Sequence, residues 1–332
     1  MGWRGGAGVP AVWHEGGQDF HAGTPQDVRT VVAAMTSEVK DNLRYGAVPW
    51  ARFHHAYGPG GDVPALLEKV RLGDEASDRA LGTLWNRVCH QGGTSAPGAL
   101  AVPFLIRIAL AYPRHRTAVL LLVGAVARRQ HFGDGSRTGL LRAGERDGSL
   151  RFGPSGYLET WSIEAARQAV AADADLLCFL LDDPQPAVRQ AAAHALAAAL
   201  PPPGHAPAAL HTRLADEADP VTRACLVLGI GQLAWEERDP TTVAQLRDWW
   251  RVPGRPTDVR VSAALAWLCL VADPVPAELD TLLDTAVTDE LTALLAPAPW
   301  LRDAQDGAND NGLLVCLTQM RNPHDFPWLT EY

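Results

Sequence analysis

The segment from Leu176 to Leu200 constrains the fold most, because it reads as a complete pair of helices. Its first apolar run ends at Asp182-Asp183-Pro184, where the proline ring removes a backbone donor and stops a helix. Pro186 then opens a second helix, whose apolar residues recur with the 3.6-residue period of one helical face. These residues are Val188, Ala191, Ala192, Ala195, Leu196 and Ala199. Two helices with one apolar face each cannot bury those faces alone, so the segment predicts neighbouring pairs of the same kind.

An arginine near the start of the second helix recurs along the chain. It is found at Arg79, Arg116, Arg189, Arg223 and Arg260, with intervals of 37, 73, 34 and 37 residues. The interval of 73 is close to two repeats, and turns rich in aspartate precede several of these arginines. A repeat of about 36 residues built from helix pairs is typical of α-solenoids. The sequence therefore predicts an all-α protein, a right-handed α-solenoid of HEAT-like helix pairs.

Further motifs lie in the N-terminal half of the chain. They are the runs WARFHHAYG at 50–58, DVPALL at 62–67, LWNRVCHQG at 84–92 and AVPFL at 101–105. With these motifs and the later Asp-Pro-x-x-Val-Arg repeats, residues 46 to 272 resemble HEAT-repeat proteins, and more narrowly a functionally uncharacterised family of them common in actinomycetes. The resemblance implies a fold and no particular activity. Residues 1–45, the Arg87-Val88-Cys89 variation and the last 50 residues depart from the family pattern.

The domain organisation follows from where the regular succession of helices begins and where it is interrupted. Residues 1–26 contain seven glycines and predict a flexible N-terminal extension. We expect residues 27–332 to form a single HEAT-like solenoid, whose first element is a capping helix at 27–44. A stretch at 132–158 also holds seven glycines and predicts a Gly/Arg-rich insertion without regular structure, of a kind that is usually functional or disordered. The other expected helices are 62–72, 76–91, 100–112, 116–130, 207–217, 220–234, 240–250, 258–271, 276–296 and 311–320.

The composition limits which cellular compartment and which kinds of chemistry we expect for this protein. No apolar run approaches the roughly 18 residues of a membrane helix, and the N-terminus lacks the apolar core of a secretory signal, so we expect a cytoplasmic protein without membrane contact. The five cysteines are far apart, which favours buried reduced thiols over disulfides or a metal site. No cofactor or metal is expected. The chain uses 27 arginines and 2 lysines, a ratio typical of a high-GC bacterial genome.

The charge is unevenly distributed. Residues 1–166 carry 18 basic and 15 acidic side chains, a net charge of +3, whereas residues 167–332 carry 11 and 23, a net charge of −12. Nine arginines between Arg107 and Arg151 face three acidic residues, a net charge of +6 over 45 residues. Such a cluster suits a phosphate or an acidic partner, and the alternative is a solvated arginine-rich surface. The candidates for partner or anion binding are Arg114, Arg116, Arg128, Arg129, Arg137 and Arg142.

A second group of candidates combines aromatic and polar residues in the first repeats. It comprises Trp50, His55, Tyr57, Trp85, His90 and Gln91. An aromatic lining with a few polar groups is how small-molecule pockets are commonly built. The alternative is that the histidines and Tyr57 hold loops in place while the tryptophans fill the core.

The function we expect is that of a non-enzymatic scaffold, whose concave face binds a protein partner. The alternative is a small-molecule-binding protein or enzyme of bacterial specialised metabolism with a pocket in the N-terminal repeats. A third hypothesis, a HEAT-like DNA glycosylase, would use Trp249, Trp250 and Trp267 with Asp248 and Arg251. These residues lie in the acidic half, so we do not expect nucleic acid to bind. No Walker A, GxSxG or HExxH motif is present, which leaves no known set of catalytic residues.

Overall fold

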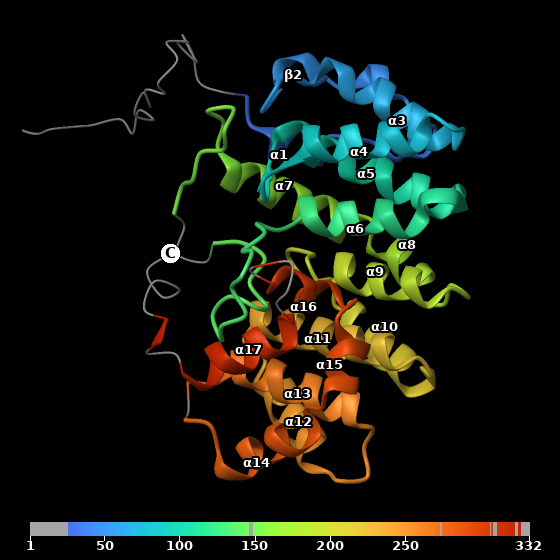
Figure 1. The fold of residues 1–332 in the computed structure, drawn as a ribbon. Helices are drawn as coiled ribbons and strands as arrows, with labels where there is room; N and C mark the ends of the chain where they lie inside the picture. The colour runs from blue at the N-terminus through green and yellow to red at the C-terminus, as the bar shows by residue number, and fades with distance from the viewer. Residues whose placement is uncertain are drawn as a thin grey trace, which may run out of the picture.

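The protein is described here from a computed structural model, which covers residues 26–145, 149–272, 274–305, 307, 311–322 and 325–326. These residues are predominantly helical, which confirms the all-α prediction, and the helices run broadly from α3 at one end of Figure 1 to α14 at the other, with α7 beside α1 and α5. The helices are α1 (Val28–Ala33), α2 (Ser37–Asp41), α3 (Val63–Leu72), α4 (Ser77–Val88), α5 (Ala96–Ala111), α6 (Arg116–Val126), α7 (Glu159–Ala172), α8 (Ala174–Leu180), α9 (Pro186–Leu196), α10 (Ala206–Asp216), α11 (Pro220–Glu237), α12 (Pro240–Arg251), α13 (Thr257–Leu270), α14 (Ala277–Ala286), α15 (Asp289–Leu295), α16 (Pro299–Asp303) and α17 (Gly312–Arg321). Two antiparallel hairpins pair β1 (His54–His55) with β2 (Gly58–Pro59) and β3 (Cys89–His90) with β4 (Gly93–Thr94). The predicted N-terminal extension lies outside the described residues apart from Gln26.

Two predicted helices are each broken into two. The segment 27–44 contains α1 and α2, and the segment 276–296 contains α14 and α15. In both cases a threonine begins the second helix, because the Thr36 side chain accepts from the Val39 N–H and the Thr288 side chain accepts from the Leu291 N–H. An N-cap of this kind competes with continuation of the preceding helix. The apolar period runs through both breaks, so periodicity alone did not reveal them.

Helix α5 is the most enclosed element of the N-terminal half. It contacts α1, α3, α4, α6, α7 and α8, and Leu100, Phe104 and Leu105 on it are fully buried. A helix that is apolar all round is one surrounded by other helices. Among the described residues no single helix has the length and hydrophobicity to cross a membrane, and the one consecutive pair that has them jointly, α5 with Pro113–Val126, is bent by 106°.

Helices α6, α9, α11 and α13 form a continuous row, each in contact with the next. Helices α8, α10 and α12 pack on α9, α11 and α13 respectively, which places each pair beside the following one (Figure 1). In α9 the residues from Ala191 to Leu196 are all buried, because this helix has neighbours on several sides. Alanine permits this close packing, since it adds little side-chain volume between helix backbones.

Three of the five recurring arginines join successive helices of this row, whereas Arg260 Nε donates to the Trp250 carbonyl. Arg116 Nη1 lies 2.6 Å from Asp183 Oδ2, just before α9. Arg189 Nε lies 2.7 Å from Glu217 Oε2, just before α11, and Arg223 Nε lies 2.8 Å from Asp258 Oδ2 in the first turn of α13. Each of these three arginines therefore pairs with an acid at or just before the N-terminus of the next helix of the row. The helix dipole also favours negative charge at that position. This contact gives a physical reason for the spacing of the arginines.

After α14 the chain turns back along the row. Figure 1 shows α16 and α17, drawn in red, beside α11 and α13 and not beyond α14. Helix α15 contacts α11, α16 contacts α9 and α11, and α17 contacts α13. The C-terminal helices thus cover one face of α9, α11 and α13.

The insertion is held under these C-terminal helices. The Gly135 N–H donates to Gln319 Oε1 at 2.7 Å, and Gln319 Nε2 donates to the Gly133 carbonyl at 2.7 Å. Arg137 Nε donates to the Met320 carbonyl at 3.0 Å. The described residues 132–145 and 149–158 contain no helix, yet Leu140, Leu141 and other side chains of the insertion are buried. The Gln319 side chain of α17 thus satisfies two backbone groups of the insertion, and turns within the insertion satisfy others.

Candidate functional site

The two tryptophans of the expected N-terminal pocket are packed among other side chains. Trp50 is buried, with its ring centroid 6.0 Å from that of Phe104 and its Nε1 donating to the Tyr45 carbonyl at 2.8 Å. Trp85 on α4 is half-buried against the core. Both rings therefore fill space between helices.

The histidines and Tyr57 of the same group are bonded to one another and to neighbours. His55 is buried, its Nε2 lies 2.9 Å from Asp62 Oδ1, and its Nδ1 accepts from the Tyr57 N–H at 3.1 Å. The Tyr57 hydroxyl lies 3.2 Å from His90 Nδ1, and the Arg87 guanidinium stands 4.4 Å from the Tyr57 ring centroid. These contacts tie the β1–β2 hairpin to β3.

Gln91 belongs to a tight turn. Its φ is 49° and that of Gly92 is 80°, and the two residues are the loop between β3 and β4. Positive φ at both central positions is the geometry of a type I′ turn, for which glycine at the second position is favoured. Neither of the two cavities described below includes Gln91 or any of the other five predicted pocket residues.

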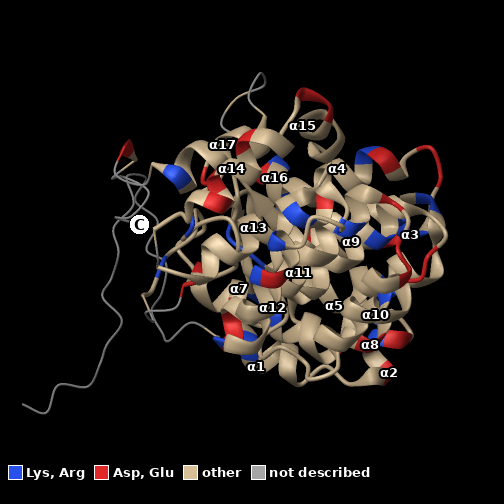
Figure 2. Ribbon diagram, turned by 90° about the horizontal axis from the view of Figure 1, so that it is seen from below, with Lys and Arg blue, Asp and Glu red and all other residues tan. Residues whose placement is uncertain are grey.

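The predicted basic cluster is divided among separate contacts. Arg114 lies 3.4 Å from Asp78 at the surface, Arg116 pairs with Asp183, and Arg142 lies 3.6 Å from Asp134. Arg107 pairs with Asp173 at 2.7 Å, far along the sequence. Basic and acidic positions are mixed over the described helices in Figure 2. Three arginines of the cluster thus pair with acids from other segments, and Arg142 and Arg151 pair with acids inside it.

Arg128 is buried and forms hydrogen bonds to groups on more than one helix. Its Nε donates to the Gly124 carbonyl at 2.9 Å and its Nη2 donates to the His194 carbonyl at 2.7 Å. Trp300 of α16 donates through Nε1 to Gln232 Oε1 at 2.7 Å, beside this guanidinium. Burial lowers the pKa of Arg128 to about 10. Arg128 therefore holds α6, α9 and α16 together and offers no surface charge.

The aromatic residues of the glycosylase hypothesis are also buried. Trp249, Trp250 and Trp267 are each less than a tenth exposed, and the Trp250 and Trp267 centroids are 5.7 Å apart. They pack α12 against α13. No ring of the three is available to stack on a base.

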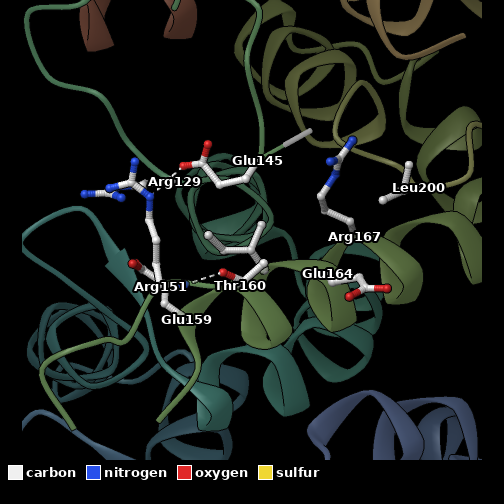
Figure 3. Close-up of a pocket in the computed structure, with 10 residues that line it drawn as sticks. Arg129, Glu145, Arg151, Glu159, Thr160, Glu164, Arg167 and Leu200 are labelled. Atoms are coloured by element: carbon white, nitrogen blue, oxygen red, sulfur yellow. Dashed lines mark hydrogen bonds and ion pairs between the residues drawn. The ribbon is translucent and has the colours of Figure 1, made fainter. Parts of the chain in front are cut away.

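A pocket of about 260 Å³ lies between the insertion and α7. Its walls combine three arginines and three glutamates with apolar groups and Thr160. The lining residues are Arg129, Gly144, Glu145, Arg151, Glu159, Thr160, Ile163, Glu164, Arg167 and Leu200. Figure 3 shows Arg129, Arg151, Glu145 and Glu159 gathered at one end, and Glu164, Arg167 and Leu200 at the other.

Arg129 is the cation at the polar end that has no ion-pair partner among the described residues. It follows α6, and its backbone N–H donates to the Ala143 carbonyl at 3.0 Å. Its Nη1 atom is buried and has no hydrogen-bond partner among the described residues. The neighbouring Arg151 is instead paired with Glu145, with Nε 2.9 Å from Oε1. Among the described residues no carboxylate therefore forms an ion pair with Arg129, although Glu159 lies at the same end of the pocket.

Glu159 is the buried carboxyl group at the same end. It is the first residue of α7 and is 6% exposed, and its Oε1 accepts from the Thr94 N–H of β4 at 2.9 Å. Burial raises the pKa of Glu159 above its ordinary value of 4.5, and Glu145 adds to this, while the Thr94 N–H and the charges of Arg129 and Arg151 oppose it. The hydrogen bond fixes the position of a carboxyl group that is costly to ionise.

The charges at the other end of the pocket are already matched. Arg167 Nη2 contacts Glu236 Oε1 at 2.5 Å, and Arg167 Nε donates to the Ala198 carbonyl at 2.9 Å. Glu164 Oε2 accepts from Arg29 at 2.7 Å. Ile163 and Leu200 add apolar surface. This end can contact an apolar group without leaving a described charge unpaired.

A second, much smaller cavity lies on the far side of Arg129. Its volume of about 20 Å³ is enough for one water. Asp303 and His131 line it, and burial raises the pKa of Asp303 while burial and nearby arginines lower the pKa of His131 to about 3. Within the described residues no group of three or more His, Cys, Asp or Glu is placed to hold a metal ion.

Sequence reasoning identified Arg129 but missed Glu159, Glu145 and Thr160. An acid in the first turn of a helix is common and favourable for the helix itself, so Glu159 gives no distinct signal. Glu145 lies in a glycine-rich loop, for which no spacing predicts a partner. Comparison with protein-family models, with curated proteins and with solved structures finds no match to this chain.

Proposed function

We propose that this chain is a HEAT-like helical-repeat protein that binds a small organic anion in the pocket between the insertion and α7. The observation that carries the proposal is Arg129, which lines the pocket and whose buried Nη1 atom has no hydrogen-bond partner among the described residues. A buried donor without a partner costs free energy, and an anionic group would satisfy it. The pocket is slightly smaller than the usual range of about 300–1,000 Å³, so the ligand is a small molecule.

The proposal also specifies the fold, as a right-handed solenoid of HEAT-like helix pairs. It is supported by helix pairs that stack in chain order and by the arginine–acid contacts between successive inner helices. The stack provides a rigid frame, and the insertion adds a binding site at its side. Function here depends on the site and not on the repeat fold itself.

A protein partner is the second candidate, and one surface favours it. The side chains of Tyr57 and Phe132 are 55% and 59% exposed. Tyr57 contacts His90, and the Phe132 ring approaches Gly92, so the two aromatic rings flank the β3–β4 turn. Binding on a concave face has less support, because the insertion and the C-terminal helices already cover part of α9, α11 and α13.

We expect Arg129→Gln to weaken binding of a small carboxylate at least tenfold, because the carboxylate loses its charged hydrogen-bond donor. The measurement is isothermal titration calorimetry with 4-methylpentanoate and with benzoate. The matched control is Arg114→Gln, which removes a surface guanidinium 50% exposed beside Asp78. Arg114→Gln should leave the affinity within twofold. Equal affinity of the Arg129→Gln variant and the unmodified protein, or no binding of either carboxylate, would refute the proposal.

A further inference from the structure

The charges around the pocket can be assigned to pairs. Glu145 is matched by Arg151, Glu164 by Arg29 and Arg167 by Glu236. The two charged residues of the lining that remain are Arg129 and Glu159. They lie at the same end of the pocket, as Figure 3 shows, close enough for the charge of Arg129 to oppose the rise in the pKa of Glu159.

A simple anion would satisfy only one of these two groups. Bound to Arg129, it would place a second negative charge near the Glu159 carboxyl group. A ligand that also carries an ammonium group avoids this repulsion, because its positive charge faces Glu159 while its anion faces Arg129. Such a ligand also leaves the charge balance of the lining unchanged.

The rest of the pocket indicates the shape of the ligand. Ile163 and Leu200 offer apolar contacts away from the charged end, and Glu164 and Arg167 are engaged with partners outside the pocket. An apolar substituent is therefore favoured at that end over another charge. A volume of about 260 Å³ limits the substituent to a short one.

We propose that the pocket binds a small zwitterion of the α-amino-acid class, with its carboxylate on Arg129, its ammonium on Glu159 and a short apolar side chain against Ile163 and Leu200. This inference rests on the proposed anion site at Arg129 and adds Glu159 as the group that binds the ammonium of the ligand. The Thr94 N–H holds Glu159 in place before the ligand arrives, so little ordering is required on binding.

The test compares three probes of similar shape: L-leucine, 4-methylpentanoate and 3-methylbutylamine. Calorimetry on the full chain should give leucine at least tenfold tighter than 4-methylpentanoate, and the amine weakest. Glu159→Gln keeps the acceptor for the Thr94 N–H but removes the charge. This variant should lose the preference for leucine while it still binds 4-methylpentanoate.

The matched control is Glu278→Gln, because Glu278 lies at the surface, pairs with Arg251 and does not line the pocket. Glu278→Gln should change leucine affinity by less than twofold. If 4-methylpentanoate binds as tightly as leucine, the zwitterion inference is overturned, although the anion site at Arg129 stands. If no probe binds, the anion site itself fails, and the two failures are thus distinguishable.

A pH titration of the unmodified protein gives a second readout that does not depend on the folding of a variant. The groups facing Glu159 are Arg129, Arg151, Glu145, the Cys89 thiol and the Thr94 N–H. Because burial raises the Glu159 pKa above 4.5, the carboxylate is lost as the pH falls through that raised pKa. The affinity for leucine, whose ammonium stays charged throughout this range, should fall in the same window. A leucine affinity that is constant with pH would contradict the assignment of the ammonium to Glu159.

Discussion

Replacing Trp300 by alanine is expected to lower the free energy of unfolding by about 3–5 kcal/mol, the usual cost of removing a buried large aromatic side chain. Trp300 is 2% exposed, its ring centroid lies 4.7 Å from that of His194, and its Nε1 donates to Gln232. It also stands 5.7 Å from the Arg128 guanidinium. The variant therefore creates a cavity, and the buried side chains of Arg128 and Gln232 lose their contacts with the indole ring. Chemical denaturation followed by circular dichroism measures the effect.

The control for this variant is Leu314→Ala on α17. Leu314 is 47% exposed, so its truncation removes little buried surface and should change stability by no more than about 0.5 kcal/mol. The comparison tests whether the C-terminal helices are part of the cooperative core. Equal and small effects of both variants would mean that α16 does not pack on α9 and α11 as described.

Removing the buried carboxylate of Glu217 should destabilise the protein by about 3–5 kcal/mol, because the Glu217→Ala variant leaves the Arg189 guanidinium without its partner. The Glu217 and Arg189 side chains are 1% and 10% exposed, and two hydrogen bonds of 2.7 Å join them. The control is Glu278→Ala, which breaks the ion pair with Arg251 at the surface. Both side chains of that pair are about half exposed, and such pairs contribute about 0–1 kcal/mol. Similar losses for the two variants would show that the arginine–acid contacts do not stabilise the helix row.

The effect of Glu217→Ala should also depend on pH. Burial acts to raise the pKa of Glu217, but the hydrogen bonds from Arg189 and from the Asp219 N–H outweigh it and lower the pKa below 4.5. The stabilisation by the ionised group is therefore fully present above about pH 4.5 and is lost as the pH falls through the folded-state pKa. The difference in stability between the two proteins should shrink in that acid range. A difference that is constant down to pH 3 would contradict this assignment.

The helices of this protein were largely predictable, because they depend on local patterns. The period of the apolar residues from Val188 to Ala199 and the proline at 186 specify α9 with few alternatives. Turn and cap residues such as Asp219 and Pro220 likewise fix the start of α11. Two expected helices are broken at Thr36 and Thr288, because there a single capping side chain interrupts an apolar period that continues on both sides.

The sequence by itself also determined the spacing of the arginines, but only the tertiary structure decided what they contact. Arg128 donates to a carbonyl 66 positions along the chain, and Gly135 receives its partner from 184 positions away. Partners at such separations depend on how the helices stack and on the return of α15, α16 and α17 along the row, neither of which a local pattern encodes. For the same reason the sequence did not reveal that the basic cluster would be divided between ion pairs, such as Arg107 with Asp173, and buried contacts to carbonyl groups, such as those of Arg128. Arg129 and Arg151 both line the pocket, but of the two only Arg151 has an ion-pair partner among the described residues, and the sequence did not distinguish them.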